Sequence, residues 1–214
     1  MLLSIYPCGP VEANMMVVGR DGAKTVAVVD PSDADLALSV LHENGWTLSD
    51  ILVTHRHFDH LLGVAKLKAE TNAKIYISEL DAAGLTSNLQ SLSLMQRISI
   101  QPVEPDVRLH DGDTFEAAGL EFRVLATPGH TVGGITFVCD EARCAFCGDT
   151  LFCESYGRYD LPTGDFSALK RSIRDVLLKL PEDYLLLPGH EQATTVAHER
   201  VSNPILSEAE PWFV

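Results

Sequence analysis

Four apolar runs of strand length each end in a short polar stretch that contains histidine or aspartate. These stretches are THRHFDH after ILV, TPGHT after FRVLA, GDT after CAFC and PGHE after YLLL. Apolar runs of this length indicate buried strands, and loops at strand ends are where a rigid sheet commonly holds catalytic groups. The pattern therefore predicts one site, built from these side chains: His55, His57, Asp59, His60, His130, Asp149 and His190.

The spacing of apolar residues predicts strands and helices along the whole chain. We expect strands over residues 2–6, 14–20, 25–30, 50–54, 73–77, 134–140, 143–148 and 183–189, and a hairpin over 107–127. We expect helices over residues 31–45, 60–72, 166–180 and 193–202, the first of them capped by Ser32. Residues 79–101 are a candidate mobile flap, because most of this stretch is polar and only weakly periodic. Strand-rich halves with helices between them predict an α+β fold, in which two sheets pack together and helices cover them.

Composition limits the class of protein and its partners. The chain has 214 residues, of which 46% are hydrophobic, so a single domain over residues 1–214 can bury a sizeable core. Its formal net charge of -14 disfavours nucleic acid and anionic membrane surfaces as partners. The N-terminus has no basic region before an apolar stretch, and no apolar run approaches about 18 residues. We therefore expect a cytoplasmic protein that acts as a monomer or a small homo-oligomer.

The cysteines do not form a framework of regular spacing, which suits a reducing compartment. Cys144 and Cys147 have the spacing of a C-x-x-C metal or redox half-site, but the segment around them is predicted to be a strand. Residues three apart in a strand point to opposite faces, so both are expected to be core cysteines. Cys153 follows the GDT stretch and could border the site, although a buried structural thiol is favoured.

The candidate ligands fit two metal ions better than one. In an extended segment His55 and His57 face the same way, whereas Asp59 and His60 point elsewhere once the chain turns into a helix. So many ligands exceed what one tetrahedral ion needs, but they suit two ions about 3.5 to 4 Å apart that share a hydroxide. The expected sets are His55, His57 and His130 on one ion, and Asp59, His60 and His190 on the other, with Asp149 between them.

A single histidine of this set would more often be a surface or hydrogen-bonded core residue. The combination is hard to explain that way, because several residues would have to coincide after separate strands. The remaining histidines, which are His42, His110 and His198, lack ligand spacing and are predicted to have solvated or structural roles.

At these residues the sequence resembles the metallo-β-lactamase superfamily, and within it the short glyoxalase II-like (hydroxyacylglutathione hydrolase-like) hydrolases. THRHFDH matches the H-x-H-x-D-H signature of that superfamily, and TPGHT, GDTLF and PGHE match its later ligand motifs in order. The resemblance runs from about Asn14 to residue 206. It implies a four-layer αββα sandwich with the metals at one edge and the same two ligand sets. It also implies a binuclear metal-dependent hydrolase.

The sequence departs from full-length glyoxalase II enzymes in regions that concern the substrate. Those enzymes use a helical C-terminal region with basic residues to bind glutathione, whereas only residues 191–214 follow His190 here. Glutathione recognition by that route is therefore not supported. The stretch 157–160 resembles the GR-x-D form of the short enzymes, and we take Arg158 and Tyr159 as candidate substrate-binding residues. Arg158 would pair either with a substrate carboxylate or with a nearby aspartate.

The ligand types and charges predict the chemistry. Nitrogen and oxygen ligands without thiolate suit two divalent ions, most simply Zn²⁺, with Fe or Mn as alternatives. Two such ions, the two aspartates and a hydroxide leave a small positive charge, which would attract a small anionic acyl-thiol substrate. Asp59 and Asp149 are the predicted catalytic carboxylates. A thiolate with a pKa of about 8.5 leaves without much help from an acid, which favours a thioester over an amide.

Three further residues are candidates for holding the ligand imidazoles in place, as metal-bound histidines usually require. These are Asp30, Thr54 and Thr131. The competing interpretation is that the two threonines are ordinary turn residues and that Asp30 is a cap before a proline.

Other functions stay open at this point. A persulfide dioxygenase-like enzyme would use one iron on His55, His130 and Asp149. Two further alternatives are hydrolysis of another small ester and metal binding without catalysis.

Overall fold

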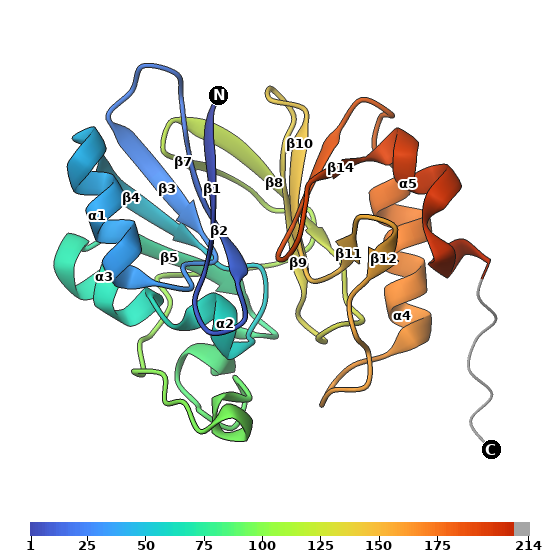
Figure 1. The fold of residues 1–214 in the computed structure, drawn as a ribbon, viewed down its shortest axis with the longest axis horizontal. Helices are drawn as coiled ribbons and strands as arrows, with labels where there is room; N and C mark the ends of the chain where they lie inside the picture. Colours follow the sequence, from blue (N-terminus) through green and yellow to red (C-terminus); the bar gives the residue numbers. More distant parts are fainter. Residues whose placement is uncertain (208–214) are drawn as a thin grey trace.

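The computed structural model describes residues 1–207 and shows two mixed sheets packed face to face, with helices on the outer face of each (Figure 1). The last residues of the predicted domain, 208–214, lie outside the described part. The predicted four-layer αββα arrangement is confirmed.

The first sheet has the strand order β1-β2-β3-β4-β5-β6. Its strands are β1 (Leu2–Cys8), β2 (Ala13–Gly19), β3 (Thr25–Val29), β4 (Thr47–Leu52), β5 (Lys74–Ser78) and β6 (Val107–Leu109). Strands β1 to β3 are antiparallel, and β3 to β6 are parallel. The parallel part requires crossover segments between its strands, and the sequence supplies helices there.

The second sheet has the order β14-β13-β10-β9-β8-β7. Its strands are β7 (Thr114–Ala117), β8 (Leu120–Ala126), β9 (Ile135–Cys139), β10 (Cys144–Gly148), β13 (Leu185–Pro188) and β14 (Thr194–Thr195). A separate small hairpin consists of β11 (Leu151–Phe152) and β12 (Ser155–Tyr156).

Helices α1 (Ala34–Asn44) and α3 (Val64–Thr71) cover the first sheet, and α4 (Phe166–Arg171) and α5 (Val196–Ser202) cover the second (Figure 1). The cap of α1 is Asp33 and not the predicted Ser32, because the Asp33 carboxylate accepts hydrogen bonds from the first exposed N–H groups. Gly45 ends this helix in the left-handed conformation with a φ of 64°.

The predicted helix over residues 166–180 is helical but not uniform. After α4 the chain makes a π-helical turn over Ser172–Val176 and then a 3-10 turn over Leu177–Lys179. The candidate flap over residues 79–101 contains two short 3-10 helices, η1 (Ala82–Leu85) and η2 (Ser93–Gln96). A last 3-10 turn, η5 (Pro204–Leu206), follows α5.

Three apolar layers hold the sandwich together. One lies between α1, α3 and the first sheet, one between the two sheets, and one between the second sheet and α4 with α5. Cys144 belongs to the layer between the sheets, whereas Cys147 belongs to the layer under α4. The two cysteines therefore point to opposite faces of β10, as the strand interpretation predicts.

Within residues 1–207, none of the helices combines the length and the apolar character that crossing a bilayer would require.

Burial predicts which thiols react in the folded protein. Cys153 and Cys8 are half-buried, whereas Cys139, Cys144 and Cys147 are buried. Burial also raises the pKa of Cys147 to about 12, so its reactive thiolate is scarce. We expect iodoacetamide at mildly alkaline pH to modify only the two half-buried cysteines, as measured by peptide mass spectrometry. A urea-unfolded sample, in which all five should react, is the control. Rapid modification of Cys147 in the folded protein would contradict the assigned strand.

Candidate metal centre

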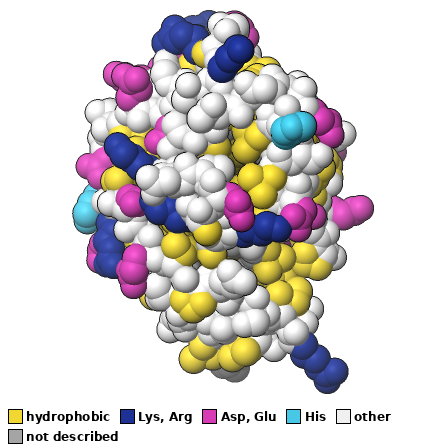
Figure 2. Space-filling model, turned by 90° about the vertical axis from the view of Figure 1, so that its left-hand side faces the viewer, with side chains coloured by type: hydrophobic (Ala, Val, Ile, Leu, Met, Phe, Trp, Pro, Cys, Tyr) yellow, Lys and Arg dark blue, Asp and Glu magenta, His cyan; other side chains and the backbone are white. Residues whose placement is uncertain are grey.

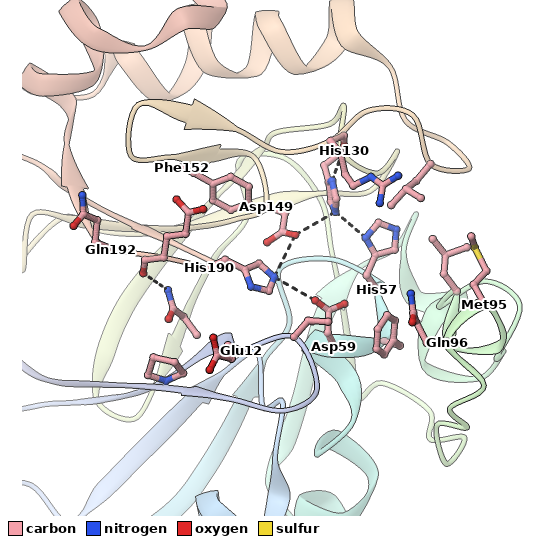
Figure 3. A pocket seen from close by; sticks show the side chains of 18 residues that line it. Glu12, His57, Asp59, Met95, Gln96, His130, Asp149, Phe152, His190 and Gln192 are labelled. Atoms are coloured by element: carbon pink, nitrogen blue, oxygen red, sulfur yellow. Dashed lines mark hydrogen bonds and ion pairs between the residues drawn. The ribbon is translucent and has the colours of Figure 1, made fainter.

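The polar stretches meet at one edge of the sandwich because of the strand directions. Strand β9 is antiparallel to both β8 and β10, and β10 is parallel to β13. The carboxyl ends of β8, β10 and β13 therefore lie at the same edge of the second sheet. The turn that leads from β4 into helix α2 (Phe58–Leu61) faces them from the first sheet (Figure 3).

The predicted ligands form two groups of three. Within each group, one donor atom from every residue lies within 4.8 Å of the others. The groups are His55, His57 and His130, and Asp59, His60 and His190. These are the sets expected from the sequence.

Asp149 lies between the two groups. Its Oδ2 atom is 3.4 Å from His130 Nε2 in the first group. In the second group, Oδ1 is 3.5 Å from His60 Nε2. Oδ2 is 3.7 Å from His190 Nε2 (Figure 3). One carboxylate therefore reaches both groups, which is the position of a bridging ligand.

Several buried polar atoms of the cluster have no hydrogen-bond partner among the described residues. They are Nε2 of His55, His57 and His60, and Oδ1 of Asp149. Buried polar atoms in native proteins are nearly always paired, and an unpaired one costs free energy unless a ligand satisfies it. Imidazole nitrogens and carboxylate oxygens converging in this way fit divalent transition-metal ions.

Two histidines of the first group, His55 and His57, are neutral at physiological pH. Burial lowers the pKa of His55 well below its ordinary value, and the neighbouring His60 adds to the effect. For His57, burial and the adjacent His130 lower the pKa to about 3. Both side chains therefore present a nitrogen lone pair, which is the form that binds a metal ion.

The carboxylates of the cluster are ionised. Burial alone would raise the pKa of Asp59, but His60 holds it well below its usual range. Burial likewise opposes ionisation of Asp149, and His60 again holds the pKa of that carboxyl below its usual range. Burial alone would lower the pKa of His60, yet Asp59 and Asp149 raise it well above its ordinary value. Positive charge between the two carboxylates therefore stabilises their ionised form, and a divalent cation would supply such a charge.

Asp30 and Thr54 hold two of the imidazoles, as the sequence predicts. His60 Nδ1 lies 3.0 Å from Asp30 Oδ2, and His55 Nδ1 lies 3.1 Å from Thr54 Oγ1. The Thr54 hydroxyl and backbone N–H both donate to the Asp30 carboxylate, at 2.6 and 2.8 Å. Asp30 itself has a φ of 48°, a conformation that Asp tolerates better than most residues. These contacts leave the Nε2 atoms of His55 and His60 directed toward the cluster.

Thr131 makes a different contact from the one predicted. Its hydroxyl donates to Asp81 Oδ2 at 2.6 Å. The Asp81 carboxylate also accepts hydrogen bonds from the backbone N–H groups of Arg56 and Gly133, both at 3.2 Å. Arg56 Nε lies 3.6 Å from Asp81 Oδ1, and both side chains are buried. This carboxylate joins the His55–His60 turn to the loop that carries His130, and the sequence analysis did not single it out.

Asn14 is a second residue that the sequence analysis missed. Its side-chain amide donates to the carbonyls of Pro188 and Glu191, at 3.0 and 2.8 Å, and its backbone N–H donates to Gly189 at 2.7 Å. Strand β2 thereby fixes the loop around His190. Gly189 is required there, because a Cβ atom would lie 2.3 Å from Asp149 Oδ1.

The candidate substrate residues lie in different surroundings. The Arg158 guanidinium pairs with both carboxylate oxygens of Asp160 at 2.9 Å, and the Arg158 carbonyl lies 2.7 Å from His130 Nδ1. Tyr159 packs its ring against Phe166, with ring centroids 4.9 Å apart, and is not among the residues that line the cavity. Cys153 is half-buried and accepts a hydrogen bond from Gln192, a residue that lines the cavity, so it is not the buried core thiol that was expected.

A cavity of about 800 Å³ opens over the cluster. The ligands that face it are His57, Asp59, His130, Asp149 and His190. Its volume is that of a small-molecule site. The histidines outside the cluster, which are His42, His110 and His198, are exposed as expected.

Comparison with known proteins agrees with this geometry. Residues 8–190 match the sequence profile of the Metallo-beta-lactamase superfamily. The hydroxyacylglutathione hydrolase GloC of Haemophilus influenzae is 32% identical over 212 residues, covering 97% of this chain and 99% of that protein. The crystal structure of the BLEG-1 B3 metallo-beta-lactamase has a TM-score of 0.91 at 30% identity, covering 97% of this chain and 100% of that chain. The crystal structure of TTHA1623 in a di-iron-bound form has a TM-score of 0.83 at 33% identity, covering 94% of this chain and 98% of that chain.

Removal of the Asp81 carboxylate should destabilise the fold. Asp81→Ala leaves the buried Arg56 charge without its carboxylate partner, and we expect the free energy of unfolding in urea to fall by about 3–5 kcal/mol. Asp175→Ala, which breaks an exposed pair with Arg174, is the matched control and should leave this free energy within experimental error. Equal values for the two variants would show that the buried pair does not hold the two loops.

Proposed function

The chain belongs to the metallo-beta-lactamase superfamily of metal-dependent hydrolases, and we propose that it uses two metal ions to hydrolyse a thioester of the hydroxyacyl-thiol type. The observation that carries this proposal is the presence of two complete ligand groups with Asp149 between them. Similarity over nearly the whole chain to a hydroxyacylglutathione hydrolase supports the reaction class, and similarity to a di-iron-bound structure supports two ions.

Zn²⁺ is the proposed metal, with Fe and Mn as the alternatives that the same donor atoms allow. Bound divalent ions would supply Lewis acidity, which lowers the pKa of water toward neutrality and polarises an acyl carbonyl. Asp59 and Asp149 would hold both the ions and the attacking water in place. The loaded site would carry a small positive charge, so the proposal includes a small anionic or polar acyl group at this end of the substrate.

The side chains around the cavity favour attack by water on a good leaving group. The described residues that line it include no Ser, Cys, Lys or Tyr, so a protein nucleophile of these types is missing there. The same residues offer no obvious general acid for a poor leaving group. A thiolate, with a pKa of about 8.5, needs little such help, whereas an amine leaving group needs it.

The rival function, oxidation of a persulfide at a single iron, would need only His55, His130 and Asp149. The second group, Asp59, His60 and His190, would then have no role. Its donor atoms also lie within 4.8 Å of one another, which favours the binuclear hydrolase.

Metal content and hydrolysis test the proposal together. We expect about two ions per purified chain and hydrolysis of a neutral lactoyl thioester far faster than of the matching amide. His190→Ala should reduce the content to about one ion, because it removes a ligand of the second group only. His198→Ala, a surface histidine, should keep both ions. The proposal would be contradicted by one iron per chain together with oxygen consumption on a persulfide and no thioester hydrolysis.

Asp30 should strengthen metal binding through His60. Asp30→Asn keeps a side chain that tolerates the left-handed backbone but removes the charge that faces the His60 imidazole. We expect metal affinity, measured by competition with a chelator, to fall by about 10- to 100-fold. Asp33→Ala removes only the cap of α1 and should leave this affinity unchanged. If Asp30→Asn left the metal affinity unaltered, Asp30 would contribute to the folded structure but not to metal binding.

A further inference from the structure

The outer part of the cavity carries negative charge. Glu12 and Glu191 both line it, both are exposed, and within residues 1–207 neither carboxylate has a hydrogen bond or an ion pair. Glu12 lies on the turn between β1 and β2, and Glu191 follows His190 directly. Both have left-handed backbones, with φ of 55° and 62°. Two turns from opposite ends of the chain thus place free carboxylates on one cavity.

Among the described residues, no Lys or Arg side chain forms an ion pair with these carboxylates. Arg158 is the single Lys or Arg side chain among the described residues that line the cavity. Its guanidinium is held by both oxygens of Asp160 at 2.9 Å, in the two-pronged geometry that Arg prefers with a carboxylate. A ligand carboxylate would have to displace Asp160 to use this cation. The outer cavity is therefore unfavourable for a thiol such as glutathione, which carries two carboxylates.

The two ends of the cavity differ in character. Figure 3 shows Glu12 and Gln192 on the side of His190, and Met95 and Gln96 on the side of His57. On the His57 side, Met95 of η2 lines the cavity and is 65% exposed, and its neighbour Leu94 is 58% exposed. Residues 79–101, which include η2, lie at the bottom of the molecule in Figure 1, and hydrophobic side chains gather at its lower end in Figure 2. The acidic surroundings are thus confined to the His190 side.

We propose that the cavity selects thioesters whose carrier thiol bears an ammonium group and no carboxylate, with the ammonium placed near Glu12 and Glu191. This inference rests on the proposed thioesterase function and adds the class of carrier. The positive charge of a loaded metal site would attract the acyl end, while the two carboxylates would attract a cation at the other end. An exposed charge pair of this kind changes affinity by about two- to fivefold, so two independent carboxylates change it by about four- to 25-fold.

The test compares thioesters that share a lactoyl group and differ in the carrier. Lactoyl thiocholine carries a permanent cation, its 3,3-dimethylbutanethiol analogue replaces that nitrogen by carbon, and lactoylglutathione carries carboxylates. We expect kcat/KM to fall in this order at low ionic strength. The ratio of the cationic to the neutral thioester should drop by about four- to 25-fold in the double variant Glu12→Gln/Glu191→Gln.

Glu116→Gln/Glu121→Gln is the matched control, because it removes two exposed carboxylates from the β7–β8 hairpin, away from the metal centre. This control should keep the ratio of the wild-type protein. A ratio near one in the wild type, or a ratio that Glu12→Gln/Glu191→Gln leaves unchanged, overturns the inference while hydrolysis of the neutral thioester upholds the proposed function. Failure to hydrolyse any of the three thioesters overturns the proposed function and the inference with it.

Discussion

The burial of several carboxylates beside a cluster of imidazoles is the constraint on which the rest of this structure depends. Asp30, Asp59 and Asp149 lie at the edge where the two sheets meet, and isolated ionised carboxylates are costly to bury there. His60 contacts all three and offsets part of the charge. Contacts with Thr54, Asp30 and the Arg158 carbonyl fix which ring nitrogen of His55, His60 and His130 faces the cluster. The whole edge of the sandwich is therefore organised around cation binding.

The sequence predicted the fold class and the ligand cluster because both depend on short-range patterns. Strand-length apolar runs set the two sheets, and each ligand follows such a run within a few residues. The split between His57 and Asp59 follows from the change of the chain from an extended turn into α2. The opposite orientations of Cys144 and Cys147 follow from the two-residue period of a strand in the same way.

Contacts between residues far apart in the chain could not be predicted from one sequence. Asp81 belongs to a weakly periodic stretch, and nothing local indicates that it binds the turn at Arg56. Asn14 looks like an ordinary strand residue until its partners, which come after β13, are known. Tyr159 stands next to Arg158 in the sequence, but only the packing of Phe166 determines that its ring turns toward the core. The π-helical turn after α4 also depends on tertiary packing, since the amphipathic pattern fits a regular helix equally well.

The ligands come from both sheets of the sandwich. His55, His57, Asp59 and His60 follow β4 of the first sheet, and His130, Asp149 and His190 follow strands of the second. An ion bound between them would join the two halves of the molecule, and its binding free energy would add to the stability of the folded state. Since unfolded chains are continuously removed by proteases, metal supply would then govern how long each molecule survives in the cell as well as how fast it works.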